Sequence, residues 1–316
     1  MAFRSRSNSD LNALPQRPDQ GGAWFRFRTS PTKFLAQYVY SQRSTATLST
    51  PETTDGGRIS VVCISDTHNT KPSLPDGDIL IHAGDLTQSG TRSELEQQID
   101  WLDAQPHRYK IVIAGNHELC LDANHPSNDG KEDTRLTLDW KSLIYLENTS
   151  RTIRFADSRV LRIFGSPHTP KHGNWAFQYP RAYAGVWDDM AVPEDTDVLI
   201  THGPPKAHLD LGHLGCQSLR QTLWSMKRRP LLHVFGHIHG GYGKEIARWD
   251  TFQRAYEAIM DEHWIWLNLI VLVYCWILGI STGWAAAGKQ ETVMVNAAAV
   301  GGVRDEKRRE AICVDL

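Results

Sequence analysis

Short apolar runs rich in β-branched residues recur along the chain and are separated by more polar segments. Six of them lie at residues 58–65, 78–83, 108–114, 159–164, 197–201 and 231–235. Each run is short and is closed by glycine, serine or a polar pair, a pattern that predicts a buried β-strand. Two later runs, at residues 292–298 and 311–316, predict another strand and a final edge strand.

Helical patterns lie between these predicted strands. Residues 93–104 begin with Ser93 and place Glu96 three positions later, which is the spacing of a capping box. Residues 133–141 and 216–227 show similar patterns. Strands that alternate with helices predict an α/β fold in which helices cover layers of sheet.

Composition and charge narrow the functional classes. The 316 residues carry a net charge of −2, which does not point to a nucleic-acid polymer as partner. Five cysteines without a CxxC pair argue against a disulfide framework and favour a reducing, cytoplasmic location. Residues 1–57 are rich in Ser, Thr and Pro, carry more basic than acidic residues, and lack the apolar region of a secretory signal. We interpret them as a disordered basic arm before a single domain at residues 58–316.

An apolar insert is expected within that domain, at about residues 248–290. Its core, residues 264–287, holds 24 residues without a charged side chain, and local composition alone predicts a transmembrane helix. The predicted strand at 292–298 argues against a single crossing, which would separate this strand from its sheet. Membrane association through 264–287 therefore stands as one expectation. Burial inside the protein or against a second copy of the chain are the alternatives.

Polar clusters follow five of the predicted strands. Residues two positions apart in an extended segment point the same way, so Asp66 and His68 can reach one ion, as can His237 and His239. Neither a GxSxG nor a Walker A sequence is present, so no serine nucleophile or phosphate-binding loop is indicated. Carboxylates, imidazoles and an amide at successive strand ends together predict a pair of metal ions held by seven ligands. The clusters are Asp66-Thr67-His68, Gly84-Asp85, Asn116-His117-Glu118, Thr201-His202 and His237-Ile238-His239.

The blocks DTH, GD, GNHE, THGPP and GHIH, in this order over about residues 58–298, resemble the calcineurin-like metallophosphoesterase superfamily. That resemblance implies a four-layer β-sandwich flanked by helices. It also implies phosphoester hydrolysis by a hydroxide that bridges two divalent ions, either Mn, Fe or Zn. His117 would act on the leaving oxygen. The resemblance implies one ion held by Asp66, His68, Asp85 and His239, and another held by Asp85, Asn116, His202 and His237.

Finer features indicate a subgroup. The stretch from Gly84 to Gly90 lacks the Asp and Arg that Ser/Thr protein phosphatases carry there. The THGPP block, the GSP at 165–167 and the NWAF at 174–177 resemble the metallophosphoesterase-domain-containing brain proteins, which implies a phosphodiesterase acting on nucleotide-like small molecules. Some members of that group have lost the first histidine of GHxH, whereas His237 is present here.

Contacts to the substrate are less well indicated. The long loop at residues 166–183 is rich in Pro, Gly and aromatic residues and is expected to line the site. His168 in this loop, and His208 after THGPP, are the candidate substrate contacts. Two alternatives remain open for the function: a membrane-associated lipid phosphodiesterase, and a slow nucleotide-binding or scaffold protein.

Overall fold

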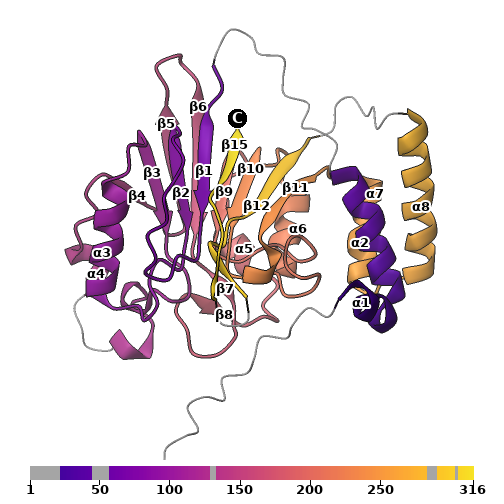
Figure 1. Cartoon of the computed structure of the whole chain (residues 1–316), viewed down its shortest axis with the longest axis horizontal. Coiled ribbons are helices and arrows are strands. Elements are labelled where there is room, and N and C mark those ends of the chain that lie inside the picture. The colour runs from indigo at the N-terminus through magenta and orange to yellow at the C-terminus, as the bar shows by residue number, and fades with distance from the viewer. Residues whose placement is uncertain (1–21, 45–56, 129–132, 283–289, 303–304) are drawn as a thin grey trace, which may run out of the picture.

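Two β-sheets packed face to face form the centre of the molecule (Figure 1). The computed structural model describes residues 22–44, 57–128, 133–282, 290–302 and 305–316. The first sheet has the order β15 (Ile312–Asp315), β1 (Ser60–Ile64), β2 (Ile79–Ala83), β3 (Tyr109–Ile113) and β4 (Leu143–Tyr145). The second has the order β11 (Gly243–Ala247), β12 (Thr292–Asn296), β10 (Leu232–Phe235), β9 (Val198–Thr201), β6 (Val160–Ser166) and β5 (Thr149–Arg154).

The alternation of side chains along each strand explains the layers. On β1, Val61 and Cys63 point into the core between the two sheets, while Val62 and Ile64 face the opposite side and pack under a helix. Both faces are therefore buried, as the nearly continuous apolar runs predicted. All eight predicted strands are present, as β1, β2, β3, β6, β9, β10, β12 and β15.

Helices cover the outer faces of both sheets (Figure 1). α3 (Arg92–Asp103) and the short α4 (Thr134–Thr137) lie against the first sheet, and α5 (Val186–Asp189) and α6 (Gln217–Ser225) against the second. The predicted cap at Ser93 is wrong by two residues, because Thr91 accepts from the backbone of Glu94 and Glu94 accepts in return from the backbone of Thr91. The observed layers are those of the expected α/β fold. Two small ladders, β7 (Thr169–Pro170) with β8 (Gln178–Tyr179) and β13 (Val300–Gly301) with β14 (Lys307–Arg308), complete the described strands.

Four helices form a separate layer beside the second sheet: α1 (Ala23–Thr29), α2 (Pro31–Ser44), α7 (Thr251–Met260) and α8 (Ile265–Thr282) (Figure 1). Tyr40 of α2 stacks on Tyr256 of α7 with ring centroids 4.0 Å apart, and Ala36 of α2 is fully buried in the same layer. The expectation of a disordered arm is therefore wrong for residues 22–44, because α2 buries apolar side chains against α7 and α8. The rest of that arm, residues 1–21 and 45–56, lies outside the described residues.

The apolar stretch at 264–287 contributes α8 and continues into residues outside the described part of the chain. Among the helices that the structure describes, none has the length and apolar character needed to cross a membrane. This finding corrects the expectation of a transmembrane helix. β12, which follows the stretch, pairs with both β10 and β11 inside the second sheet, so the chain returns to the same body.

Candidate metal centre

The polar clusters meet at one end of the two sheets. Their strands β1, β2 and β3 run parallel in the first sheet, and β9 and β10 run parallel in the second. The carboxyl ends of parallel neighbours lie at the same edge of a sheet, so the loops that follow them converge. The structure thereby brings together Asp66, His68, Asp85, Asn116, His202, His237 and His239.

The ligand atoms form two groups that share one carboxylate. Asp66, His68, Asp85 and His239 make up the first group, and Asp85, His202 and His237 make up the second. Within each group the ligand atoms all lie within 4.8 Å of one another. The Asn116 Oδ1 atom lies 3.1 Å from His202 Nε2, beside the second group. The geometry is suited to two ions that share Asp85 as a bridging ligand.

The backbone at this centre is strained. Asp66, His68, Asp85 and His237 have φ values of 51°, 42°, 54° and 64°, in the left-handed region that side-chain-bearing residues avoid. Each such residue costs about 1–3 kcal/mol unless its surroundings hold it in place. Hydrogen bonds to the carboxylates provide part of that support. The backbone N–H of His237 donates to Asp66 at 3.0 Å, and that of His117 donates to Asp85 at 2.9 Å.

Three imidazoles are oriented by a partner on their outer nitrogen. The Nδ1 atoms of His68 and His202 lie 3.2 Å and 2.9 Å from the carbonyl oxygens of Thr87 and Ala83. The Nδ1 atom of His239 lies 2.7 Å from a carboxylate oxygen of Asp305. Because an Nδ1–H donates to each of these oxygens, the Nε2 lone pair of each ring is directed toward the centre. This is the usual way in which proteins orient metal-binding histidines.

Two observations show that the residues fit a pair of divalent ions. The Nε2 atom of His68 is buried without a hydrogen-bond partner and lies 3.9 Å from Asp85 Oδ2, too far for a hydrogen bond. Leaving such a group unsatisfied costs about 1–3 kcal/mol, and a cation at this point would satisfy it. A Cβ on Gly236 would lie 2.0 Å from Asp66 Oδ2, and one on Gly115 would lie 2.3 Å from Asp85 Oδ1. Only glycine lets the backbone approach the two carboxylates so closely.

The electrostatics favour positive charge at this centre. Burial alone would raise the pKa of Asp85, but the charge and hydrogen bond of His202 hold it well below its usual range. Burial opposes protonation of His202, yet Asp85 raises the pKa of that imidazole to about 9. Burial would likewise raise the pKa of Asp66, but His239 lowers it. Both carboxylates are therefore ionised near neutral pH, and a divalent ion can replace the proton of His202 beside them.

Glu118 holds the loops that carry the candidate ligands through backbone hydrogen bonds, a role that the sequence analysis did not assign. Its buried carboxylate accepts from the backbone N–H of Gly115 at 2.6 Å, Asp85 at 3.0 Å and Thr87 at 2.9 Å. The Thr87 hydroxyl donates a fourth bond at 2.9 Å. Glu118 thereby ties the loop after β2 to the loop after β3. Its place directly after Asn116-His117 is a signal that the sequence contained.

His117 is half-buried at the rim of the centre. Its Nδ1 atom lies 2.8 Å from the carbonyl oxygen of Gln88, and its ring stacks on Trp175 with centroids 4.3 Å apart. The loop at 166–183 also brings His172 to the centre, with its ring centroid 5.0 Å from that of His237. Sequence reasoning expected this loop to line the site but singled out neither Trp175 nor His172. His168 of the same loop is half-buried and packs edge-on against Phe177 at 5.7 Å.

The structure places His208, the other candidate substrate contact, in a buried ionic cluster. Its side chain is fully buried, with Nδ1 2.5 Å from Glu245 and Nε2 3.0 Å from Glu257. Both ring nitrogens are therefore occupied by carboxylates of β11 and α7. Neither nitrogen is therefore available to a substrate. The two ion pairs instead link β11 of the second sheet to α7 of the helical layer.

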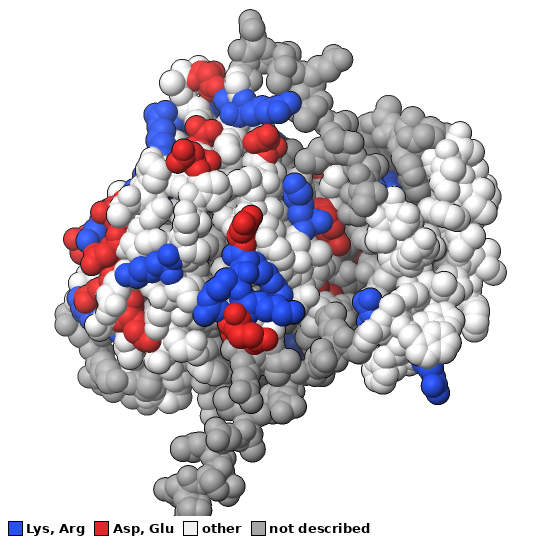
Figure 2. Space-filling model, viewed as in Figure 1, with Lys and Arg blue, Asp and Glu red and all other residues white. Residues whose placement is uncertain are grey.

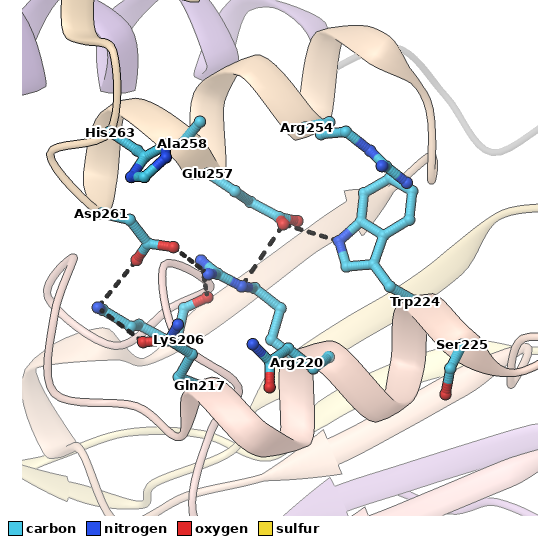
Figure 3. Close-up of a pocket in the computed structure, with 11 residues that line it drawn as sticks. Lys206, Gln217, Arg220, Trp224, Ser225, Arg254, Glu257, Ala258, Asp261 and His263 are labelled. Carbon is cyan, nitrogen blue, oxygen red and sulfur yellow. Dashed lines mark hydrogen bonds and ion pairs between the residues drawn. The ribbon is translucent and has the colours of Figure 1, made fainter. Parts of the chain in front are cut away.

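A cavity of about 600 Å³ between α6 and α7 adjoins this cluster (Figure 3). Glu257 accepts from Trp224 Nε1 at 2.7 Å and pairs with Arg220 Nε at 3.5 Å. Asp261 pairs with Arg220 and also with Lys206, the latter at 2.8 Å. Lys206 and Arg220 are thus paired with Asp261 and Glu257 across the gap, while Arg254 lies over the ring of Trp224 at 4.4 Å from its centroid. We interpret this network as a set of ion pairs that joins α6 to α7.

The His208 cluster predicts how stability depends on pH. Burial would lower the pKa of His208, but Glu245, and then Glu257, raise it to about 10 from 6.5. A raised pKa in the folded state contributes stability that is complete below pH 6.5 and is lost as the pH rises through about 10. We expect His208→Gln to lower the free energy of unfolding by about 3 kcal/mol near neutral pH. This deficit should shrink as the pH approaches 10, as urea titrations at several pH values can measure.

The surface histidine His213 provides the matched control for that experiment. It is exposed, and His213→Gln is expected to change the free energy of unfolding by less than about 0.5 kcal/mol at every pH. A deficit in His208→Gln that stayed constant up to pH 10 would contradict the assignment of a protonated His208 between two carboxylates.

The comparison with protein families agrees with the geometry. The family model for calcineurin-like phosphoesterases matches residues 59–241. A protein of Emericella nidulans called probable rhamnogalacturonate lyase C is 65% identical over 306 residues, which are 97% of this chain but 29% of that protein. Metallophosphoesterase domain-containing protein 1 of Homo sapiens is 41% identical over 204 residues, 58% of this chain and 61% of that protein. The chain therefore spans less than two thirds of either relative. The crystal structure of TT1561 from Thermus thermophilus aligns with 82% of this chain and 99% of its own, with a TM-score of 0.41 and 11% identity.

Proposed function

Because the chain belongs to the calcineurin-like phosphoesterase family, we propose that it is a metal-dependent phosphodiesterase that hydrolyses a small, nucleotide-like phosphodiester. One observation carries the proposal. Two groups of buried or half-buried ligands share Asp85, and the ligand atoms of each lie within 4.8 Å of one another. Imidazole nitrogens mixed with carboxylate and amide oxygens suit borderline divalent ions such as Mn, Fe or Zn.

Divalent ions bound at this centre would neutralise phosphate charge and acidify a water for attack on phosphorus. The chain itself holds and orients the groups around them. Asp66, His68, Asp85 and His239 would hold one ion, and Asp85, Asn116, His202 and His237 the other. The strained loops fix these side chains before substrate arrives, so little reorganisation is needed during the reaction.

His117 would act on the leaving group. Its Nδ1–H donates to the Gln88 carbonyl, and stacking on Trp175 fixes the plane of the ring. In the imidazolium form, Nε2–H is then free to donate a proton to the ester oxygen as the P–O bond breaks. His117 is half-buried beside His68, at 4.6 Å between ring centroids, so it can meet a phosphate held at the centre.

The rim of the centre supports a diester that carries a flat organic group. Trp175 and His172 present ring faces or edges next to His117 and His237. Such rings bind nucleobases by stacking. His168 lies in the same loop and remains a candidate substrate contact.

The name of the Emericella nidulans relative does not change this proposal. The chain spans only 29% of that protein, and the ligand set described here is one for phosphoester hydrolysis. Of the two alternatives from the sequence, neither gains a specific observation. A lipid substrate has no contact in its favour among the described residues, and a binding protein without turnover is disfavoured because every ligand position is filled.

The proposal predicts the preferred substrate. With Mn²⁺ present, we expect kcat/KM for bis(p-nitrophenyl) phosphate to exceed that for p-nitrophenyl phosphate by about tenfold or more, a barrier difference of about 1.4 kcal/mol. A chelator should abolish the activity, and added metal should restore it, because the ions supply the charge that the chain lacks. Steady-state rates of p-nitrophenolate release measure both effects.

A preference for the monoester would overturn the diester assignment and indicate a phosphatase. Absence of turnover on either compound, with two equivalents of metal bound, would instead indicate a binding protein. Protein carried through the same steps without chelator is the control for damage caused by handling.

A further inference from the structure

The helical layer carries a surface that the metal centre does not use. α7 and α8 lie beyond residues 59–241, the part of the chain that the family model matches. α8 contains no Asp, Glu, Lys or Arg in 18 residues. One of its faces packs on α2 and α7, where Leu272 is fully buried and Leu269 is partly buried. The opposite face is just as apolar but points outward.

The exposed face has a regular spacing. Trp266 is 73% exposed, Ile270 68% and Ile277 56%. Together with Val273 and Ile280 they follow one another at intervals of four, three, four and three residues. This is the spacing of the apolar seam through which one helix packs against another. Leu267 and Tyr274, also exposed, flank the seam at an interval of seven.

We propose that this face of α8 is the contact surface of a homodimer, in which α8 packs against α8 of a second copy of the chain. A helix that is apolar on all sides is stable in water only when all of its sides are covered. The seam and its flanks expose on the order of 100 Å² per residue, which gives an apolar area of about 700 Å². Standard-size interfaces bury about 600–1,000 Å² from each partner, and the area of this face falls within that range.

The charge distribution favours a second copy over a lipid surface. Helices that lie on membranes carry Lys and Arg along their polar side, and α8 has neither. The acidic residues just before it, Asp261 and Glu262, are paired with Lys206 and Lys33, so the basic groups there are not free for anionic lipid. Figure 2 shows the side of the molecule over α8 as largely free of charged side chains. Lipid tails also impose no heptad spacing, whereas a partner helix does.

The side chains suggest how two copies meet. Val273, the smallest side chain of the seam, lies at its middle, and the bulkier Trp266 and Ile280 lie at its ends. An antiparallel pair related by a twofold axis would cross at Val273, where the helices can approach most closely. Ile270 of each copy would then face Ile277 of the other. The ion pairs that join α7 to α6 would hold α7, and with it this face of α8, in a fixed position relative to the two sheets.

Sedimentation velocity of the full chain without detergent tests the dimer. We expect the wild type to be dimeric across about 1–50 μM, and Ile270→Glu to weaken the dimer at least 100-fold because a carboxylate cannot be buried in an apolar seam. Leu136→Glu on α4, at a residue that is 83% exposed, is the matched control and should leave the dimer intact. An equal mixture of the Ile270→Glu and Ile277→Lys variants should dimerise again, since antiparallel pairing sets the two charges opposite each other.

Each other outcome overturns the proposal. A wild type that stays monomeric at the highest concentration has no such interface. A dimer that survives Ile270→Glu uses another face. A monomer that floats with phosphatidylcholine vesicles, and loses this property in Ile270→Glu, shows that the face binds lipid instead. Rates on bis(p-nitrophenyl) phosphate and far-UV circular dichroism spectra should match the wild type in these variants, which separates loss of the dimer from loss of the fold or of the proposed activity.

Discussion

Asp85→Asn is expected to lower kcat/KM for bis(p-nitrophenyl) phosphate by about a thousandfold or more, equivalent to a barrier about 4 kcal/mol higher. Asp85 is the one side chain common to both ligand groups, and the charge and hydrogen bond of His202 keep it ionised despite its burial. An amide has the same shape but carries no charge, so it can neither bridge two cations nor offset their mutual repulsion. Metal analysis of the purified variant should find that it binds at most one ion where the wild type binds two.

Asp100→Asn is the matched control, because Asp100 is an exposed carboxylate of α3 that pairs with Lys141 on the surface. It should retain both metal and activity. Circular dichroism should show that the Asp85→Asn protein is folded. A folded Asp85→Asn variant with two bound ions and wild-type turnover would remove Asp85 from the bridging position.

His117→Gln is expected to lower kcat for an alkyl phosphodiester by about 100-fold while both ions stay bound. Glutamine preserves the size of the side chain but cannot deliver a proton to the leaving oxygen. The loss should therefore grow with the pKa of the leaving group: small for p-nitrophenolate, which departs without help, and large for an alkyl ester of the same phosphate. Rates for a series of aryl and alkyl phosphodiesters, measured at constant metal occupancy, give this dependence.

An equal loss for every leaving group would show that His117 stabilises charge on phosphate and does not act as the proton donor. Loss of metal would show that it is a ligand. His213→Gln removes a surface histidine and should behave as the wild type in all of these assays.

Much of the fold could be predicted because strands with both faces buried need continuous apolar, β-branched runs. The run at 58–65 became β1, and the run at 231–235 became β10. The clustering of the site could be predicted for a related reason. Parallel strands end at one edge of a sheet, so Asp66 after β1 and Asp85 after β2 had to become neighbours.

Other features could not be predicted, because local signals compete. Ser93 and Thr91 can both cap a helix, and only the position of Glu94 against Asn69 and the Thr91 backbone decides between them. The composition of residues 1–57 as a whole indicates a polar arm, and the apolar residues of α2 gain stability only when Tyr40 reaches Tyr256, more than two hundred positions away.

The sequence by itself determined the order of the strands along the chain, the chemistry of the ligands and their place at strand ends, because these depend on local periodicity and residue type. The tertiary structure alone decided which lone side chains belong to the centre. Trp175 and His172 lie beside it on the loop at 166–183, and Glu118 holds its loops through backbone hydrogen bonds. His208 lies instead in a buried ionic cluster. Each of these outcomes depends on contacts between segments distant in sequence, whose free energy appears only when burial brings the partners together.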